Sequence, residues 1–307
     1  MAPPFGLLVM AYGGPDRIED VEPYLRDVRG FRETPPHVAD EVRRRYAAIG
    51  GRSPILERTR AQASALEAVL TRDGLPCPVF VGMRHWHPYI GDALARMAEA
   101  GIERAVGLVM APHNSRMSVD LYFKEVDEAA SPVAMAPIRS WHLLPGFVDA
   151  VTDRVRSALG RFPRDVRARV PVVFTAHSLP QRILEWNDPY PTELAATVRL
   201  VVERLGHPPH RFAYQSAAMT RDPWLGPDVG DVVETLAGVG HRDIVLAPIG
   251  FTCEHVEILY DVDIELRQRV RTLGVRLERI EMVNEHPAMM SDLARLVRDT
   301  AAAQGWI

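Results

Sequence analysis

Residues 248–265 read PIGFTCEHVEILYDVDIE. They follow an apolar strand signal at 243–247 and turn at Gly250. From Glu254 onward an apolar residue recurs at every fourth position, and these positions are Ile258, Val262, Leu266 and Val270. That period predicts a helix with one buried stripe. The stretch therefore predicts a buried strand, a tight turn and an amphipathic helix in direct succession.

A row of carboxylates lies beside the apolar stripe on the same predicted helix. Its members are Glu254, Glu257, Asp261 and Glu265. Like charges at this spacing repel by about a few tenths of a kcal/mol per pair, yet no Lys or Arg occurs between Glu254 and Arg267. The row is either a solvated acidic face, whose first members complement the helix N-terminus, or a path for a divalent cation. In either case we expect a cationic group to meet this face.

His255 lies within the acidic row and allows two interpretations. A lone histidine is most often an ordinary half-buried side chain. Together with Glu257, however, it would offer the nitrogen and oxygen donors that suit a first-row divalent metal.

Composition excludes several classes of protein. The 307 residues suffice for one large or two ordinary domains, and 36 Lys+Arg against 40 Asp+Glu, a net charge of -4, argue against a nucleic-acid partner. The two cysteines form no CxxC motif, so they cannot by themselves build a zinc knuckle or an iron–sulfur cluster. The N-terminus lacks a secretory signal pattern, and no apolar run approaches the roughly 18 residues of a spanning helix. We therefore expect a soluble, cytoplasmic protein with reduced thiols and no stable membrane insertion.

Strand and helix signals alternate along the chain, which predicts α/β architecture with parallel sheets. The predicted strands are 5–11, 78–82, 105–110, 133–138, 170–175, 211–215, 244–247 and 275–281. The predicted helices are 55–72, 90–100, 118–129, 146–159 and 290–303, after a mostly helical, charged stretch at 16–50. The pattern divides near residue 140 into similar halves, an N-terminal domain of residues 1–140 and a C-terminal domain of residues 141–287. The last helix, 288–304, could fold back onto the first half.

Polar residues follow several predicted strands. Tyr12 follows the first strand of the first half, and His177 follows the first strand of the second. Further polar clusters, at 84–87 and 113–115, follow the second and third strands. Ligands of open α/β sheets bind at the carboxyl ends of the strands, so we expect these side chains and the turn at 254–257 to line one cleft. A GxGxxG dinucleotide motif and a GxSxG nucleophile elbow are both absent, which argues against a dinucleotide enzyme and a serine hydrolase.

Arginines are numerous between residues 16 and 50, among them Arg29 and Arg45. Clustered guanidinium groups suit carboxylate ligands through bidentate hydrogen bonds. The alternative is that most of them pair with the acidic residues of the same stretch.

Several segments taken together resemble the ferrochelatases, enzymes that insert ferrous iron into a porphyrin. They are Leu8–Gly13, Arg45–Pro54, Ala176–Pro180, Asp188–Pro191, Gln215–Ser216, Asp222–Pro227 and Gly250–Glu257. These segments occur in the family's order across nearly the whole chain. The resemblance implies two Rossmann-like domains, each with a four-stranded parallel sheet flanked by helices, and a deep cleft for the macrocycle.

The resemblance also implies roles for particular residues. The motif histidine and the glutamate of the H-x-E segment handle the metal and the protons in the family, and here these are His177 and Glu257. His255, Asp261 and Glu265 match the metal path. Tyr12, Arg29, Arg45, Ser53 and Tyr122 match the contacts to the macrocycle and its propionates.

Within the family the sequence is most similar to the coproporphyrin III enzymes, mainly through Tyr12, where protoporphyrin enzymes tend to carry methionine. The segment 111–115 and Tyr122 support the same assignment. The sequence departs from the family pattern at two positions. Gly30 stands where a second basic residue often follows Arg29, which weakens the case for binding four propionates, and Glu254 replaces the usual aspartate before His255.

The resemblance implies that the protein inserts Fe²⁺ into coproporphyrin III for heme biosynthesis. In this mechanism the cleft distorts the ring, a neutral His177 accepts pyrrole protons, and Glu257 draws iron along Asp261 and Glu265. Iron is a substrate here, and no iron–sulfur cluster or other cofactor is expected. The partners would be coproporphyrin III and Fe²⁺, with transient contacts to neighbouring heme-pathway enzymes. The alternatives are protoporphyrin IX as substrate, a chelatase for cobalt or nickel, and a non-catalytic tetrapyrrole carrier.

Overall fold

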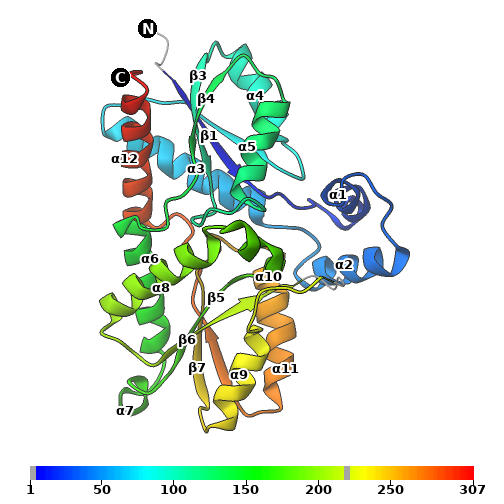
Figure 1. Ribbon diagram of the computed structural model, residues 1–307, viewed down its shortest axis with the longest axis vertical. Helices are drawn as coiled ribbons and strands as arrows, with labels where there is room; N and C mark the ends of the chain where they lie inside the picture. The colour runs from blue at the N-terminus through cyan, green and yellow to red at the C-terminus, as the bar shows by residue number, and fades with distance from the viewer. Residues whose placement is uncertain (1–4, 218–221) are drawn as a thin grey trace.

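The computed structural model describes residues 5–217 and 222–307, and within these ranges the strands form two four-stranded parallel sheets. The first sheet has the order β2-β1-β3-β4 and the second the order β6-β5-β7-β8. Helices cover both sheets (Figure 1). Within the described ranges, no helix combines the length and the apolar composition that crossing a membrane requires.

The central strand of the first sheet, β1, is buried along its whole length. The sheet consists of β1 (Gly6–Ala11), β2 (Val79–Met83), β3 (Arg104–Val109) and β4 (Ala134–Ile138). Leu7 and Val9 pack with α3 (Ile55–Arg72), whereas Leu8 and Met10 pack with α4 (Ile90–Glu99) and α5 (Val119–Glu128). Successive side chains of a strand point to opposite faces, so helices on both faces leave β1 fully buried.

The second sheet is built in the same way. It consists of β5 (Val172–His177), β6 (His210–Gln215), β7 (Asp243–Pro248) and β8 (Arg276–Arg279). Phe174 packs with α6 (Pro145–Gly160) and α8 (Tyr190–Leu205), and Val173 packs on the other face with α9 (Val229–Gly238). Short helices complete this half: α7 (Arg164–Arg167), α10 (Val256–Leu259) and α11 (Arg267–Arg271).

Two helices of the charged N-terminal stretch, α1 (Val21–Val28) and α2 (Pro36–Ala48), project from the first half, on the right of Figure 1. The C-terminal helix α12 (Pro287–Ala303) packs against α3 of the first half and α6 of the second. The chain therefore ends on the surface that joins the two halves, while the boundary at 140/141 stays a prediction.

Three side-chain contacts fix the two halves at the cleft. The Thr252 hydroxyl donates to the Met110 carbonyl at 3.0 Å. On the other side, the amides of Asn114 and Arg116 donate to the carboxylates of Glu193 and Asp188 at 2.6 and 2.8 Å. Because these bonds join segments that follow strands of opposite sheets, the carboxyl ends of both sheets are held face to face.

The expected fold is confirmed: every predicted strand occurs, with ends shifted by no more than three residues. The sequence pattern gives no helix signal for α8 or α9. Pro189 and Pro191 suggest a turn at 188–191, but Tyr190 and Pro191 begin α8, where a proline in the first turn is compatible with a helix.

The packing of α12 on α6 depends on Gly146. A Cβ atom there would lie 2.1 Å from the carbonyl oxygen of Ala288. We expect Gly146→Ala to lower the free energy of unfolding by about 2–3 kcal/mol, because the two helix backbones must move apart. Gly160→Ala is the matched control in the same helix, since nothing lies within 4 Å of the added Cβ. Chemical denaturation of both variants measures the difference, and equal stabilities would contradict this account of the contact.

Candidate active site

A cavity of about 290 Å³ opens between the carboxyl ends of the two sheets. Its walls come from both halves, because residues after β1, β2 and β3 face residues after β5 and β7. The polar and aromatic side chains that line it are Tyr12, Tyr24, Tyr46, Ser53, Thr59, Arg84, His113, Ser118, Tyr122, His177, Tyr190, Phe251, Thr252, His255 and Glu257. The arrangement is the one expected for a ligand site at the carboxyl ends of parallel strands.

Tyr12 forms the wall of the first half and remains 38% exposed. Its ring centroid lies 4.6 Å from that of His85, whose Nδ1 lies 2.7 Å from Asp27 Oδ1. Burial in the cleft and the negative charge of Glu257 raise the pKa of Tyr12 to about 12. The phenol is therefore neutral at pH 7 and is held in place by the His85 ring.

His177 and Glu257 form the wall of the second half. His177 is the last residue of β5, and Glu257 lies in α10, which starts after the turn at Gly250. The Nε2 atom of His177 lies 3.3 Å from Oε1 of Glu257, and Nε2 of His255 lies 3.3 Å from Oε2. One carboxylate thus bridges two imidazole rings at the cavity surface.

The backbone around this pair is fixed by hydrogen bonds. The Tyr190 hydroxyl donates to the His177 carbonyl at 3.0 Å, and Gln215 donates to the Glu257 carbonyl at 3.1 Å. The Nδ1 atom of His177 is hydrogen-bonded to the Ser178 carbonyl. Because Nδ1 is occupied, Nε2 is the ring atom of His177 that faces Glu257.

The charges of the pair are linked. Burial by itself lowers the pKa of His177, but the charge and the hydrogen bond of Glu257 raise it to about 9. Burial likewise would raise the pKa of Glu257, but His177 and then His255 hold it well below its usual range. Contact between the two groups therefore favours the imidazolium form of His177 and the carboxylate form of Glu257 in the substrate-free protein. This direction is opposite to the neutral His177 that the sequence led us to expect.

The acidic row continues outward from Glu257 along a helix that is not a regular α-helix. The chain passes from α10 into a π-helical segment, Asp261–Leu266, and only then into α11. The apolar stripe is buried as expected. The predicted helical stretch is therefore present, but its apolar spacing of four does not distinguish a π-helix from an α-helix.

Asp261 and Glu265 meet the cation that the sequence led us to expect, and it is Arg45 from α2. The guanidinium lies 3.1 Å from Asp261 Oδ1 and 3.8 Å from Glu265 Oε1. At the inner end of the row, Arg58 lies 3.3 Å from Glu254. Burial, followed by the charge of Glu257, raises the pKa of Asp261 to about 6, against the opposing effect of Ser216 and Arg45. Asp261 is thus largely ionised at pH 7.

Most of the residues singled out from the sequence meet at the cavity. Those that line it are Tyr12, Ser53, Tyr122, His177, His255 and Glu257. Arg45 lies outside the lining, on the acidic row. Arg29 follows α1 as an exposed residue and is not part of the lining.

Sequence reasoning gave no role to several lining residues. Arg84 lies 2.8 Å from Glu125 and 5.6 Å from the Tyr122 ring centroid, and burial lowers the pKa of His113 to about 3. Both residues belong to the polar clusters that follow predicted strands, so the sequence indicated that they lie at the cleft but not what they do there. For Tyr46 and Tyr190, the sequence offered no indication of a place in the cavity, except that both lie in segments that resemble the family.

Within the described residues, no group of three or more His, Cys, Asp or Glu side chains is arranged to hold a metal ion by itself. His177, His255 and Glu257 instead contact one another. Such donors suit a metal in passage, since each can exchange a protein partner for the ion.

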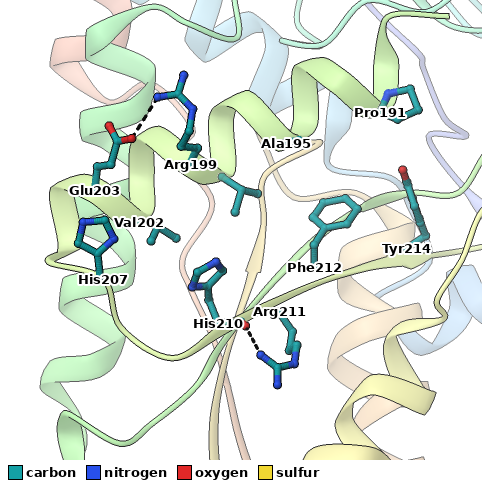
Figure 2. Close-up of a pocket in the computed structure, with 11 residues that line it drawn as sticks. Pro191, Ala195, Arg199, Val202, Glu203, His207, His210, Arg211, Phe212 and Tyr214 are labelled. Atoms are coloured by element: carbon teal, nitrogen blue, oxygen red, sulfur yellow. Dashed lines mark hydrogen bonds and ion pairs between the residues drawn. The ribbon is translucent and has the colours of Figure 1, made fainter. Parts of the chain in front are cut away.

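A second hollow, of about 600 Å³, lies between α8 and the edge strand β6 (Figure 2). His207, His210 and Phe212 line it, and Arg199 pairs with Glu203 at 3.0 Å along its rim. None of its described lining residues is among those that the sequence singled out. The chemistry that the sequence predicts is therefore concentrated in the smaller cavity between the sheets.

Comparison with known proteins shows the family to which the chain is similar. The family model described as ferrochelatase matches residues 4–301. A protein from Herpetosiphon aurantiacus named ferrochelatase is 42% identical over 297 residues, which are 95% of this chain and 97% of that protein. The coproporphyrin III ferrochelatase of Bacillus subtilis is 38% identical over 298 residues, which are 95% of this chain and 96% of that protein.

Solved structures of chelatases share the fold. SirB from Bacillus subtilis with Fe³⁺ superposes with a TM-score of 0.60 at 14% identity, over 98% of this chain and 96% of that one. CbiX, described as the terminal enzyme of siroheme biosynthesis in denitrifying bacteria, superposes with a TM-score of 0.52 at 12% identity, over 96% of this chain and 98% of that one. The extent of the family match and the identity to its members lead to one conclusion: this chain belongs to the ferrochelatase family, whose enzymes insert iron into a porphyrin.

Proposed function

We propose that the porphyrin substrate is coproporphyrin III and that the product is its iron complex, an intermediate of heme biosynthesis. The observation that carries the proposal is the composition of the Tyr12 wall. Around the Tyr12 phenol, the hydroxyl groups of Tyr46, Ser53 and Tyr122 and the guanidinium of Arg84 line the same cavity. Hydroxyl and guanidinium donors suit carboxylate groups, and coproporphyrin III carries four propionates where protoporphyrin IX carries two.

Glu257 and His177 have distinct roles in the proposed reaction. The Glu257 carboxylate offers an oxygen ligand for Fe²⁺ on its way into the ring. Two pyrrole protons must leave as the metal enters. The imidazole of His177 first releases its own proton to solvent, and then accepts the pyrrole protons one at a time, passing the first to solvent before it takes the second. Iron at Glu257 weakens the attraction that retains the proton of His177, so metal arrival and proton acceptance are linked.

Tyr12 faces this pair from the opposite half of the cavity. A macrocycle between the two walls would have its lower and upper faces in contact with different chemical groups, a neutral phenol on one side and an ion pair on the other. Contacts behind Tyr12 hold its ring at the cavity wall. The Tyr12 ring packs on the His85 ring, and Asp27 holds the His85 ring in place.

Protoporphyrin IX is the alternative substrate. Arg29 is exposed and lies outside the cavity lining, and Gly30 removes the basic residue that often follows it. The relative from Herpetosiphon aurantiacus is named ferrochelatase without a stated porphyrin. The relatives from Bacillus subtilis and Geobacillus kaustophilus, in contrast, are named coproporphyrin III ferrochelatases.

Substrate preference tests the proposal directly. Purified protein is incubated anaerobically with Fe²⁺ and either coproporphyrin III or protoporphyrin IX, and loss of the free-porphyrin spectrum is followed. We expect kcat/KM to be at least about 10-fold higher for coproporphyrin III, because each added charge-assisted hydrogen bond contributes about 1.5–3 kcal/mol. Tyr122→Phe, which removes one hydroxyl donor, is expected to narrow the preference. Equal or greater turnover of protoporphyrin IX would contradict the proposal.

We further propose that the enzyme works in the cytoplasm without a resident cofactor, and that its contacts with neighbouring heme-pathway enzymes are transient. Two cysteines in 307 residues are too few for the usual four ligands of an iron–sulfur cluster. Both are buried free thiols whose pKa burial raises to about 12, as expected for inert structural cysteines.

A further inference from the structure

Arg45 is next to a cavity residue in sequence, but its side chain contacts the acidic row. It lies on α2, one residue before Tyr46, whose side chain lines the cavity. Its guanidinium nevertheless contacts the acidic row: Nη1 lies 3.1 Å from Asp261 and Nη2 lies 3.8 Å from Glu265. Figure 1 shows α2 beside α10, where the row begins.

Two edges of the Arg45 guanidinium are directed at protein carboxylates. Its Nε donates to Glu41 at 3.1 Å, and its guanidinium carbon lies 5.1 Å from the centroid of the Tyr260 ring. With Nη1 on Asp261, the planar donor fork is committed to protein carboxylates. Arg45 therefore cannot present the same fork to a propionate without leaving Asp261.

The same contacts neutralise the acidic row. Asp261 has a side chain that is only 12% exposed, and its second oxygen accepts a hydrogen bond from Ser216. A cation that approaches Asp261 must compete with the guanidinium for a carboxylate that is already paired on both oxygens. In the porphyrin-free protein, a divalent metal must therefore displace the Arg45 guanidinium to bind Asp261.

We propose that Arg45 exchanges between the acidic row and a propionate of the bound porphyrin, so that porphyrin binding opens the row to the metal. This inference rests on the proposed function. Withdrawal of the guanidinium leaves Asp261 one helical turn from Glu257 as a half-buried carboxylate that keeps its hydrogen bond from Ser216 but loses its counter-charge. An unpaired buried charge is unfavourable, and a divalent cation relieves it. The exchange orders the two substrates: the porphyrin first, then the iron.

The exchange predicts a positive coupling between the two ligands, and coupling of binding free energies is reciprocal. The probe is Mn²⁺, which carboxylates bind well, titrated by the electron paramagnetic resonance signal of the free ion. The porphyrin is zinc coproporphyrin III, which keeps the four propionates while its ring nitrogens are already occupied. We expect it to tighten Mn²⁺ binding to the wild-type protein by about 10-fold, within the usual range of coupling between sites.

Three variants distinguish the loss of the Arg45 side chain from the loss of a positive charge in general. In Arg45→Gln the row is open from the start, so Mn²⁺ is expected to bind the porphyrin-free protein more tightly, and the porphyrin is expected to change that affinity less than about twofold. Arg44→Gln is the matched control, because Arg44 lies on the same helix and pairs with Glu41 but not with Asp261. It should keep the coupling, and Arg45→Lys, which retains the charge, should keep part of it.

The outcomes are distinguishable. Wild-type protein that inserts iron but binds Mn²⁺ equally well with and without the porphyrin would overturn the exchange alone. Full coupling retained in Arg45→Gln would overturn it as well. Protein that inserts no iron into coproporphyrin III would overturn the proposed function, and the exchange with it.

Discussion

His177→Ala is expected to lower the rate of iron insertion by about 1,000-fold, the middle of the range that a positioned general base contributes. The variant keeps Glu257, Tyr12 and the cavity, so porphyrin binding should change little. Stopped-flow measurement of anaerobic insertion separates the chemical step from binding of the porphyrin.

His142→Ala is the matched control for this change. His142 is also a half-buried histidine beside a carboxylate, with its Nδ1 3.2 Å from Glu193, but it does not line the cavity. We expect its insertion rate to stay within a few-fold of wild type. A His177→Ala rate in the same range would show that the base role assigned to His177 is wrong.

Glu257→Gln is expected to lower the insertion rate by about 100-fold and to change the protonation of His177. In the wild-type protein the ring keeps its proton until the pH rises through about 9, because the Glu257 carboxylate outweighs burial. Without that charge, burial acts with little opposition, so the pKa of His177 should fall below its ordinary value of 6.5. At pH 7 the variant then carries a neutral His177, whereas the wild type carries an imidazolium.

Histidine-selective NMR measures this difference, with the His177 resonance assigned from its loss in His177→Ala. A midpoint near 9 that disappears in Glu257→Gln supports the ion pair. A wild-type midpoint below 7, or one unchanged by the substitution, would contradict the electrostatic account of the cavity.

The sheets could be predicted because burial on both faces leaves a direct mark on sequence. Strands such as 6–11 are continuous apolar runs, and helices alternate with the strands along the chain. Helix α8 was missed because Pro189 and Pro191 suggest a turn, although proline fits the start of a helix. The π-helical segment could not be found in this way, since its apolar spacing of four also fits an α-helix.

The candidate site was predictable in its residues but less so in its contacts. Position after a strand identified Tyr12 and His177, because parallel strands end at one edge of a sheet. The pairing of Arg45 with Asp261 joins residues 216 positions apart, and no local pattern encodes such a contact. The protonation of His177 depends in the same way on the 3.3 Å approach of Glu257.

The central claim is that one cavity between the two sheets holds the porphyrin, with Tyr12 on one side and the His177–Glu257 pair on the other. A crystal structure of the protein with coproporphyrin III tests it most directly. We expect the macrocycle between these side chains, with propionates near Ser53 and Tyr122. A porphyrin bound instead in the hollow between α8 and β6, or with its ring nitrogens remote from His177 and Glu257, would contradict the account.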